Sequence, residues 1–235
     1  MNRFGTSQPQ SNVVVNEEVA RGFIVKVYGW MTLALVITGL VSVATAMSPD
    51  IMNTIASSGA FLFIVIAQLV VVIALSAVVR KLSPGVATGL FILYSALTGL
   101  TFSMLFFIYT ATSIGQVFII TAGTFGLVSA YGYVTQRDLT SIGNLAFMAL
   151  IGLILASLVN IFLASSVLSW VLSVVGVIIF VALIAYDTQR IKRMAMVIGE
   201  DGEVQRKAAV IGALALYLDF INLFLRLLNL FGRRR

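Results

Sequence analysis

Two aspartates lie in the last two hydrophobic stretches of the chain, and they are the residues best suited to chemistry. Asp187 ends the run GVIIFVALIAYD, and Asp219 lies within ALALYLDFINLFLRLL. A carboxylate at the centre of a membrane helix costs about 2.5 to 3.5 kcal/mol, so it is seldom retained without a role. Two carboxylates on adjacent spans predict an intramembrane proton or cation site. The alternative is that each one only hydrogen-bonds a neighbouring helix.

The two spans that carry these aspartates run in opposite directions, so their packing could bring the carboxyl groups together in the inner half of the membrane. At a separation of about 4 Å and an effective dielectric of about 20, the repulsion between two such charges is about 4 kcal/mol. A pair of this kind holds one proton over a wide pH range and loses it in a coupled step. The pattern therefore predicts a pH sensor in a chain that has no histidine.

Other polar side chains inside the spans predict a secondary polar path. Asn222 and Arg226 follow Asp219 by three and seven residues, so the three lie on about one face of a helix. Gln68 lies inside the second span and Asn160 inside the fifth. For each amide the alternative is an ordinary hydrogen bond between helices.

Calcium is the only metal that the carboxylates suggest, and only in transit. Calcium prefers about six to eight oxygen ligands, so Asp187 and Asp219 predict a weak, transient cation site and no resident cofactor. The acidic run Glu200, Asp201 and Glu203 lacks the spacing of an EF-hand and is interpreted as a solvated loop.

The composition excludes most other classes of function. Of 235 residues, 60% are hydrophobic and only 10% are charged, which is typical of a membrane protein with several spans. There is no cysteine and no histidine, so thiol nucleophiles, Ser-His-Asp triads and histidine-bound zinc are excluded, and no enzyme activity is expected. The basic residues that give the net charge of +6 flank the spans, which indicates membrane topology and not nucleic-acid binding.

The elements that must position these residues are long apolar helices within the lipid bilayer. We predict an all-α membrane protein, a bundle of seven transmembrane helices formed by residues 27–231, between an N-terminal tail of residues 1–26 and a basic tail of residues 232–235. A span needs about 20 apolar residues. The runs of suitable length are residues 27–47, 61–79, 86–109, 114–134, 145–164, 167–187 and 208–230. A charged loop of residues 188–207 is expected before the last span.

The distribution of lysine and arginine predicts a cytoplasmic N-terminus. With that end inside, the basic residues lie in the N-terminal tail and the three inner connections, apart from those in the last span and the C-terminal tail. The three outer connections hold none. Asp138, in one inner connection, is expected either to pair with Arg137 or another inner segment, or to be solvated. Seven crossings put the basic C-terminus outside, and a re-entrant last segment is the alternative.

Several motifs resemble those of the Bax inhibitor-1 family, in particular its bacterial inner-membrane members. The segments are ALYLDFINLFLRLL in the last span, IAYDTQRIK in the sixth, YGYVTQRDL closing the fourth, MALIGLILASLVN in the fifth, LYSALTGLT in the third and VYGWMT in the first. The resemblance covers the chain from about residue 20 to its end.

This resemblance implies a seven-helix bundle whose last helix is central, and a pH-sensitive calcium leak governed by a hydrogen-bonded aspartate pair. The matching positions are Asp187 and Asp219. The family's latching arginine near the inner end of the second span corresponds to Arg80, with Lys81 as the other candidate. Gln68 stands where the family has a glutamate, so one carboxylate of the family's pattern is absent here.

Three further functions compete with a calcium leak. The chain could regulate a membrane protease or another membrane partner through its N-terminal tail and basic inner loop. It could be an intramembrane aspartyl protease, but Leu216, Tyr217 and Leu218 precede Asp219 in place of a GxGD motif. A retinal receptor is excluded because the last span has no internal lysine; Lys207 lies at its mouth.

Overall fold

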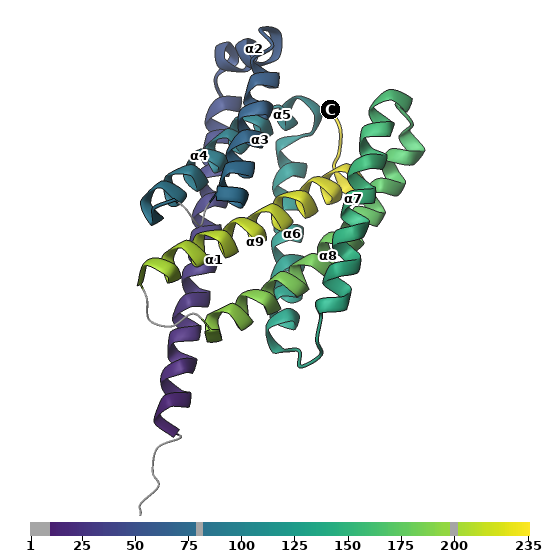
Figure 1. Cartoon of the computed structure of the whole chain (residues 1–235). Helices are drawn as coiled ribbons and strands as arrows, with labels where there is room; N and C mark the ends of the chain where they lie inside the picture. Colours follow the sequence, from purple (N-terminus) through teal and green to yellow (C-terminus); the bar gives the residue numbers. More distant parts are fainter. Residues whose placement is uncertain (1–9, 79–81, 198–201) are drawn as a thin grey trace, which may run out of the picture.

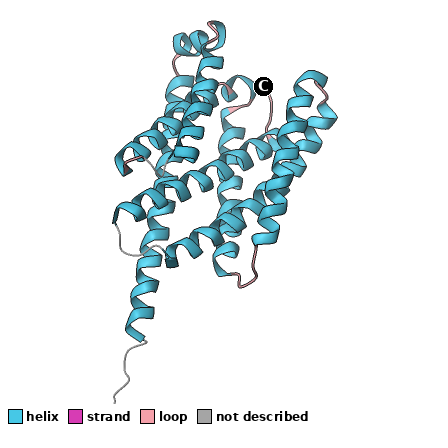
Figure 2. Cartoon of the chain, viewed as in Figure 1, coloured by secondary structure: helices cyan, strands magenta, loops and turns pink. Residues whose placement is uncertain are grey.

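The computed structural model describes residues 10–78, 82–197 and 202–235, and every regular element in these residues is a helix (Figure 2). The short helices are α2 (Pro49–Ser57) and α5 (Leu105–Ile108), which continues α4 after a break at Met104. The long helices are α1 (Gln10–Ala46), α3 (Ala60–Val78), α4 (Pro84–Ser103), α6 (Ala111–Val134), α7 (Thr140–Leu163), α8 (Ser166–Val197) and α9 (Gly202–Phe231).

Seven of the described helices are long and apolar enough to cross a membrane, which confirms the predicted all-α membrane fold. They extend over residues 20–46, 60–77, 84–108, 111–134, 140–163, 166–197 and 202–231. Each of the seven predicted spans has at least one boundary within a few residues of the corresponding helix boundary. Apolar runs of this length leave the chain no other way to satisfy its backbone polar groups in lipid.

Local capping explains where two of these spans begin. Ser83 accepts a hydrogen bond from the backbone N–H of Val86 at 3.4 Å, and Pro84 follows at the first helical position. The Thr110 side chain accepts from Ser113 N–H at 3.3 Å and starts α6. Short capped turns of this kind force consecutive spans to run antiparallel.

The last helix, α9, is the most deeply buried of the seven spans. In the most apolar stretch of α9, 72% of the residues are buried, against 39% or less in the corresponding stretch of each of the other six spans. It packs against α1, α4, α6 and α8, and Figure 1 shows it running diagonally across the bundle. A side chain in the middle of α9 is therefore surrounded by protein.

Two polar regions are more helical than the sequence suggested. In the predicted loop of residues 188–207, the described residues 188–197 and 202–207 are helical; residues 198–201 lie outside the described residues. The helix α8 continues ten residues beyond Asp187 because Ile191 and Ala195 are buried against the bundle. Within the predicted tail of residues 1–26, α1 is helical from Gln10 onward, so no break marks residue 27.

The C-terminal tail lies beside the turn between α5 and α6. Thr110 N–H donates to Arg233 O at 3.1 Å, and Arg235 N–H donates to Ile108 O at 3.0 Å. Arg233 N–H donates to the Ser113 hydroxyl at 2.8 Å. The end of α9 therefore lies at the far end of the bundle from the α6–α7 connection, as expected for a full seventh crossing (Figure 1).

Candidate functional site

Asp219 lies in the buried middle of α9. Only 6% of the residue is exposed, and its Oδ2 atom has no hydrogen-bond partner in the part of the chain that the structure describes. Asp187, the other aspartate of the last two spans, lies on α8, which packs against α9. A buried carboxylate oxygen without a donor is costly, and a second carboxylate nearby increases that cost.

Asp187 occupies a more open position than Asp219. Its side chain is 16% exposed, and Arg190 Nη1 lies 4.0 Å from its Oδ1. The Arg190 side chain is 61% exposed, so this ion pair on one helix is weak. Asp187 is therefore a partly exposed carboxylate that lies beside the basic last turns of α8.

Close approaches of two glycines fix the segment of α8 that carries Asp187. A Cβ atom on Gly132 of α6 would overlap the carbonyl oxygen of Ala185. A Cβ on Gly143 of α7 would overlap the ring of Tyr186. Since both contacts precede Asp187 directly, helices α6 and α7 set the position of its carboxyl group.

The hydroxyl of Thr188, the residue after Asp187, links α8 to two more helices. It lies 3.3 Å from the Tyr28 hydroxyl on α1 and donates to the Ser129 hydroxyl on α6 at 3.4 Å. These contacts could not be predicted from the residue types, because serine and threonine are common in membrane helices.

Tyr217, two residues before Asp219, forms a second polar link that sequence reasoning missed. Its ring is fully buried, and its hydroxyl lies 2.7 Å from Thr38 Oγ1 on α1. Thr38 Oγ1 donates to Ser95 O on α4 at 2.9 Å, so Tyr217 is the donor to Thr38. A tyrosine in the middle of an apolar span, away from the interface belt, was the available signal.

Gln68 joins two helices and leaves neither end of its amide free. Its Nε2 donates to Thr98 Oγ1 at 3.0 Å, and its Oε1 accepts from Thr101 Oγ1 at 2.8 Å. Both threonines belong to α4, so Gln68 ties α3 to α4 within the membrane region.

The other polar residues of the predicted secondary path also have local contacts. None of them forms an ion pair with Asp187 or Asp219. Arg226 makes no ion pair with a described carboxylate; its side chain packs so closely on α8 that a Cβ on Gly176 would lie 2.9 Å from Arg226 Cδ. The amides bond nearby backbone: Asn160 Oδ1 accepts from Ser165 N–H at 3.2 Å, and Asn222 Nδ2 donates to Leu218 O at 2.8 Å.

The predicted latch residues Arg80 and Lys81 lie outside the described residues, as do Glu200 and Asp201. Glu203 forms an ion pair with Lys207 at 3.0 Å. Among the described residues no group of three or more acidic side chains is arranged to hold a metal ion.

Asp138 anchors the α6–α7 connection to the end of α8. Its Oδ1 accepts from the Thr140 hydroxyl at 2.6 Å and from Arg193 Nη2 at 2.7 Å. Arg193 also donates to Gln189 Oε1 at 2.8 Å, and Gln189 Nε2 donates to Arg137 O at 2.8 Å. The partner of Asp138 is thus Arg193 of the next inner segment, not Arg137. The Thr140 hydrogen bonds, together with Arg193, lower the pKa of Asp138 below its usual range.

We expect Asp138→Asn to lower the melting temperature of the purified protein at neutral pH. Because the folded state depresses the pKa of Asp138, its contribution is present above the ordinary aspartate pKa of about 3.9 and declines as the pH falls toward the folded value. Thermal unfolding at a series of pH values measures this. The difference between wild type and variant should shrink below about pH 4. An Arg193→Gln variant and the double variant complete the cycle; additive losses would show that the two side chains do not act together.

Comparison with known proteins places this architecture in a family. Residues 20–235 match the family model described as "Inhibitor of apoptosis-promoting Bax1". The chain is 51% identical over 238 residues to the inner membrane protein YbhL of Escherichia coli K12, covering 100% of both chains. It is 44% identical to an uncharacterized protein of Borreliella burgdorferi, over 98% of this chain and 97% of that one. A Rickettsia prowazekii protein is also 44% identical, over 93% of this chain and 92% of the other.

Proposed function

This chain belongs to the Bax inhibitor-1 family of membrane proteins, and we propose that it is a pH-sensitive calcium or cation leak of the bacterial inner membrane. Its full-length similarity to an inner membrane protein supports the location. Seven helices suited to crossing a membrane supply the framework. The family supplies the membrane-protein class; the leak and its control by pH rest on the aspartates.

The observation that carries the proposal is the buried carboxylate of Asp219 on α9, together with a second aspartate, Asp187, on the adjoining helix α8. Two such groups in a low-dielectric site retain one proton, because ionising both would set two like charges against each other. At low pH the shared proton allows α8 and α9 to pack closely. As the pH rises the proton is lost, and repulsion between the carboxylates loosens this contact and opens a path.

A leak needs a site that a cation can enter and leave. Asp187 is partly exposed and its only described ion-pair partner is the solvated Arg190, at the limit of an ion-pair distance. A calcium storage site provides about six to eight oxygen ligands, and two carboxylates offer fewer than that. Weak, transient binding is what conduction requires. In this proposal Arg80 is the latch that pairs with the freed carboxylate, and Lys81 is the other candidate.

We infer a cytoplasmic N-terminus from the charges at the two ends of the bundle. The end that carries the α6–α7 connection and the last turns of α8 has Arg137, Arg190, Lys192 and Arg193. At the other end the connections α1–α2, α2–α3, α5–α6 and α7–α8 have no basic residue, and the basic residues there are those of the C-terminal tail. Basic residues favour the cytoplasmic side, so the partly exposed Asp187 faces the cytoplasm.

Calcium flux into dye-loaded proteoliposomes tests the function of the wild-type protein. We expect a flux above that of empty liposomes, rising between about pH 6 and about pH 8, by at most about tenfold per pH unit for a single proton. Liposomes with an unrelated seven-helix protein control for leakage caused by reconstitution. A flux equal to the control at every pH would exclude the leak.

A regulatory role through protein contacts is the second candidate, and α1 favours it. This helix begins at Gln10, well before its membrane-spanning part at Ala20, and Figure 1 shows its first turns extending beyond the other helices. Deletion of residues 1–19 separates the two functions. Unchanged calcium flux with loss of a co-purifying membrane protease would assign the extension to regulation; loss of flux would assign it to the leak.

A further inference from the structure

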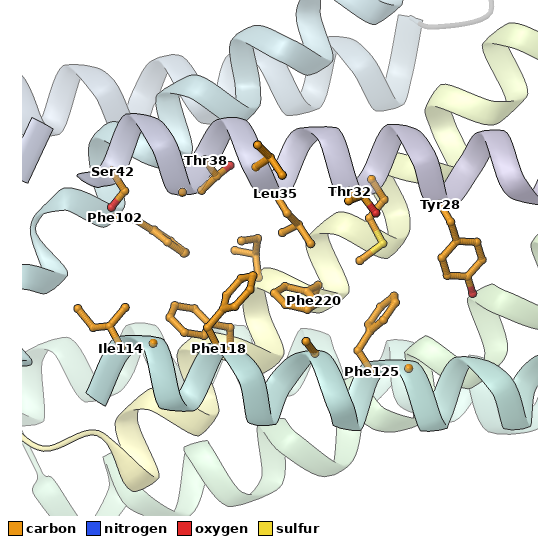
Figure 3. Close-up of a pocket in the computed structure, with 18 of the residues that line it drawn as sticks. Tyr28, Thr32, Leu35, Thr38, Ser42, Phe102, Ile114, Phe118, Phe125 and Phe220 are labelled. Carbon is orange, nitrogen blue, oxygen red and sulfur yellow. The ribbon is translucent and has the colours of Figure 1, made fainter. Parts of the chain in front are cut away.

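A large apolar cavity lies between α1 and α6, and neither Asp187 nor Asp219 lines it. Its volume is about 1090 Å³, above the range of roughly 300 to 1,000 Å³ of most small-molecule pockets. Figure 3 shows α1 along one wall and α6 along the other, with Phe220 of α9 between them. Phenylalanines from three regions of the chain line it: Phe102, Phe106, Phe118, Phe125, Phe220 and Phe224.

The cavity is open along its side, toward the space that lipid fills in a membrane. On α1 the lining residues Val36 and Leu40 are 50% and 67% exposed. On α6 the lining residue Phe118 is 42% exposed. From Ile24 to Val43 it follows α1 for about 28 Å at about 1.5 Å per residue, which is close to the thickness of a hydrocarbon core of about 30 Å. An occupant of this groove must be long, thin and apolar.

One end of the groove is basic and aromatic. Tyr133 lines the cavity, and Lys192 Nζ lies 4.7 Å from the centre of its ring and donates to its backbone oxygen at 2.7 Å. In the described part of the chain Lys192 has no carboxylate partner. An unpaired ammonium beside a tyrosine at the membrane interface complements a phosphate headgroup.

We propose that this groove binds one anionic phospholipid, with an acyl chain between α1 and α6 and its headgroup at Lys192. The apolar walls accept the chain, and the charge at Lys192 selects a net-negative headgroup over a zwitterionic one. Neither Asp187 nor Asp219 lines the groove, so lipid binding can be tested separately from the leak.

Glycines in the groove provide a way to fill it without disturbing the backbone. Gly126 of α6 lines the cavity, and a Cβ there would meet nothing within 4 Å. Gly123, on the same helix, also has open space around its Cβ but does not line the cavity. Gly126→Phe and Gly123→Phe therefore change helix propensity and apolar surface equally, and only the first blocks the groove. Gly115→Phe is a second blocking variant, since Gly115 lines the cavity with the same freedom.

Photocrosslinking tests the proposal, with phosphatidylglycerol that carries a diazirine in its acyl chain, in proteoliposomes of the full-length protein. We expect labelled peptides from the facing surfaces of α1 and α6. Gly126→Phe and Gly115→Phe should each lower this labelling by about tenfold, because the ring displaces several methylene groups of the lipid. Gly123→Phe should leave it unchanged.

A second comparison tests the headgroup. Lys192→Gln should reduce labelling by phosphatidylglycerol to the level obtained with the matching phosphatidylcholine probe. Three results would overturn the proposal: labelling of the exposed face of α7 as strong as that of the groove, no loss in either blocking variant, or a cross-link between two copies of the chain across α1 and α6.

Discussion

Replacing Asp219 by asparagine is expected to make the calcium flux nearly independent of pH between about pH 6 and about pH 8. The side chain is buried and its Oδ2 has no partner among the described residues, so an amide of the same shape fits the site. Without Asp219, the carboxylate of Asp187 has no second carboxylate with which to share a proton. The shared proton, and with it the pH response, is lost.

Asp187→Asn should have the same effect, because either substitution removes one carboxylate of the pair. Asp138→Asn is the matched control: it removes a carboxylate outside the membrane, held by Thr140 and Arg193, and should keep the pH response of wild type. Flux in proteoliposomes at a series of pH values measures all three variants. A wild-type pH response in Asp219→Asn would remove the pair from the mechanism.

Replacing Gly132 by valine is expected to destabilise the bundle by about 3 kcal/mol or more. The added side chain would overlap the backbone of Ala185, which cannot turn aside as a flexible side chain could. Helices α6 and α8 must then separate, and Asp187 moves with α8. Flux and stability should therefore fail together in this variant.

Gly123→Val separates this effect from the general cost of valine in a helix. It lies on the same helix with nothing within 4 Å of its Cβ position. The melting temperature of Gly123→Val should equal or exceed that of wild type, because glycine is a poor helix former. Equal melting temperatures for the two valine variants would show that the close contact at Gly132 does not hold the bundle together.

The apolar runs were sufficient to predict seven spans and their order. They were insufficient for the region after Asp187, where charged residues suggested a loop but α8 continues. Its continuation depends on Ile191 and Ala195, whose burial comes from the packing of other helices and has no local signature. Residues whose placement in lipid costs much free energy can be recognised from the sequence. Residues whose position depends on contacts between distant helices cannot.

The same distinction applies to the candidate site. Asp187 and Asp219 stand out in sequence because a carboxylate in lipid is expensive. Tyr217 and Thr38 do not, because their hydrogen bond depends on how α9 crosses α1. The groove between α1 and α6 depends on the tilt of whole helices, which no single segment encodes. Gln68 was correctly considered a possible interhelical bond, and its two threonine partners support that interpretation.

The most direct test of the shared proton is infrared spectroscopy of the carboxyl groups in proteoliposomes, recorded with the calcium flux on the same samples. We predict one protonated carboxyl group that ionises over the same pH range in which the flux rises, with the same midpoint as the flux. This ionisation should be absent in both Asp187→Asn and Asp219→Asn. A wild-type spectrum that does not change over this range, or one whose change persists in either variant, would contradict the account.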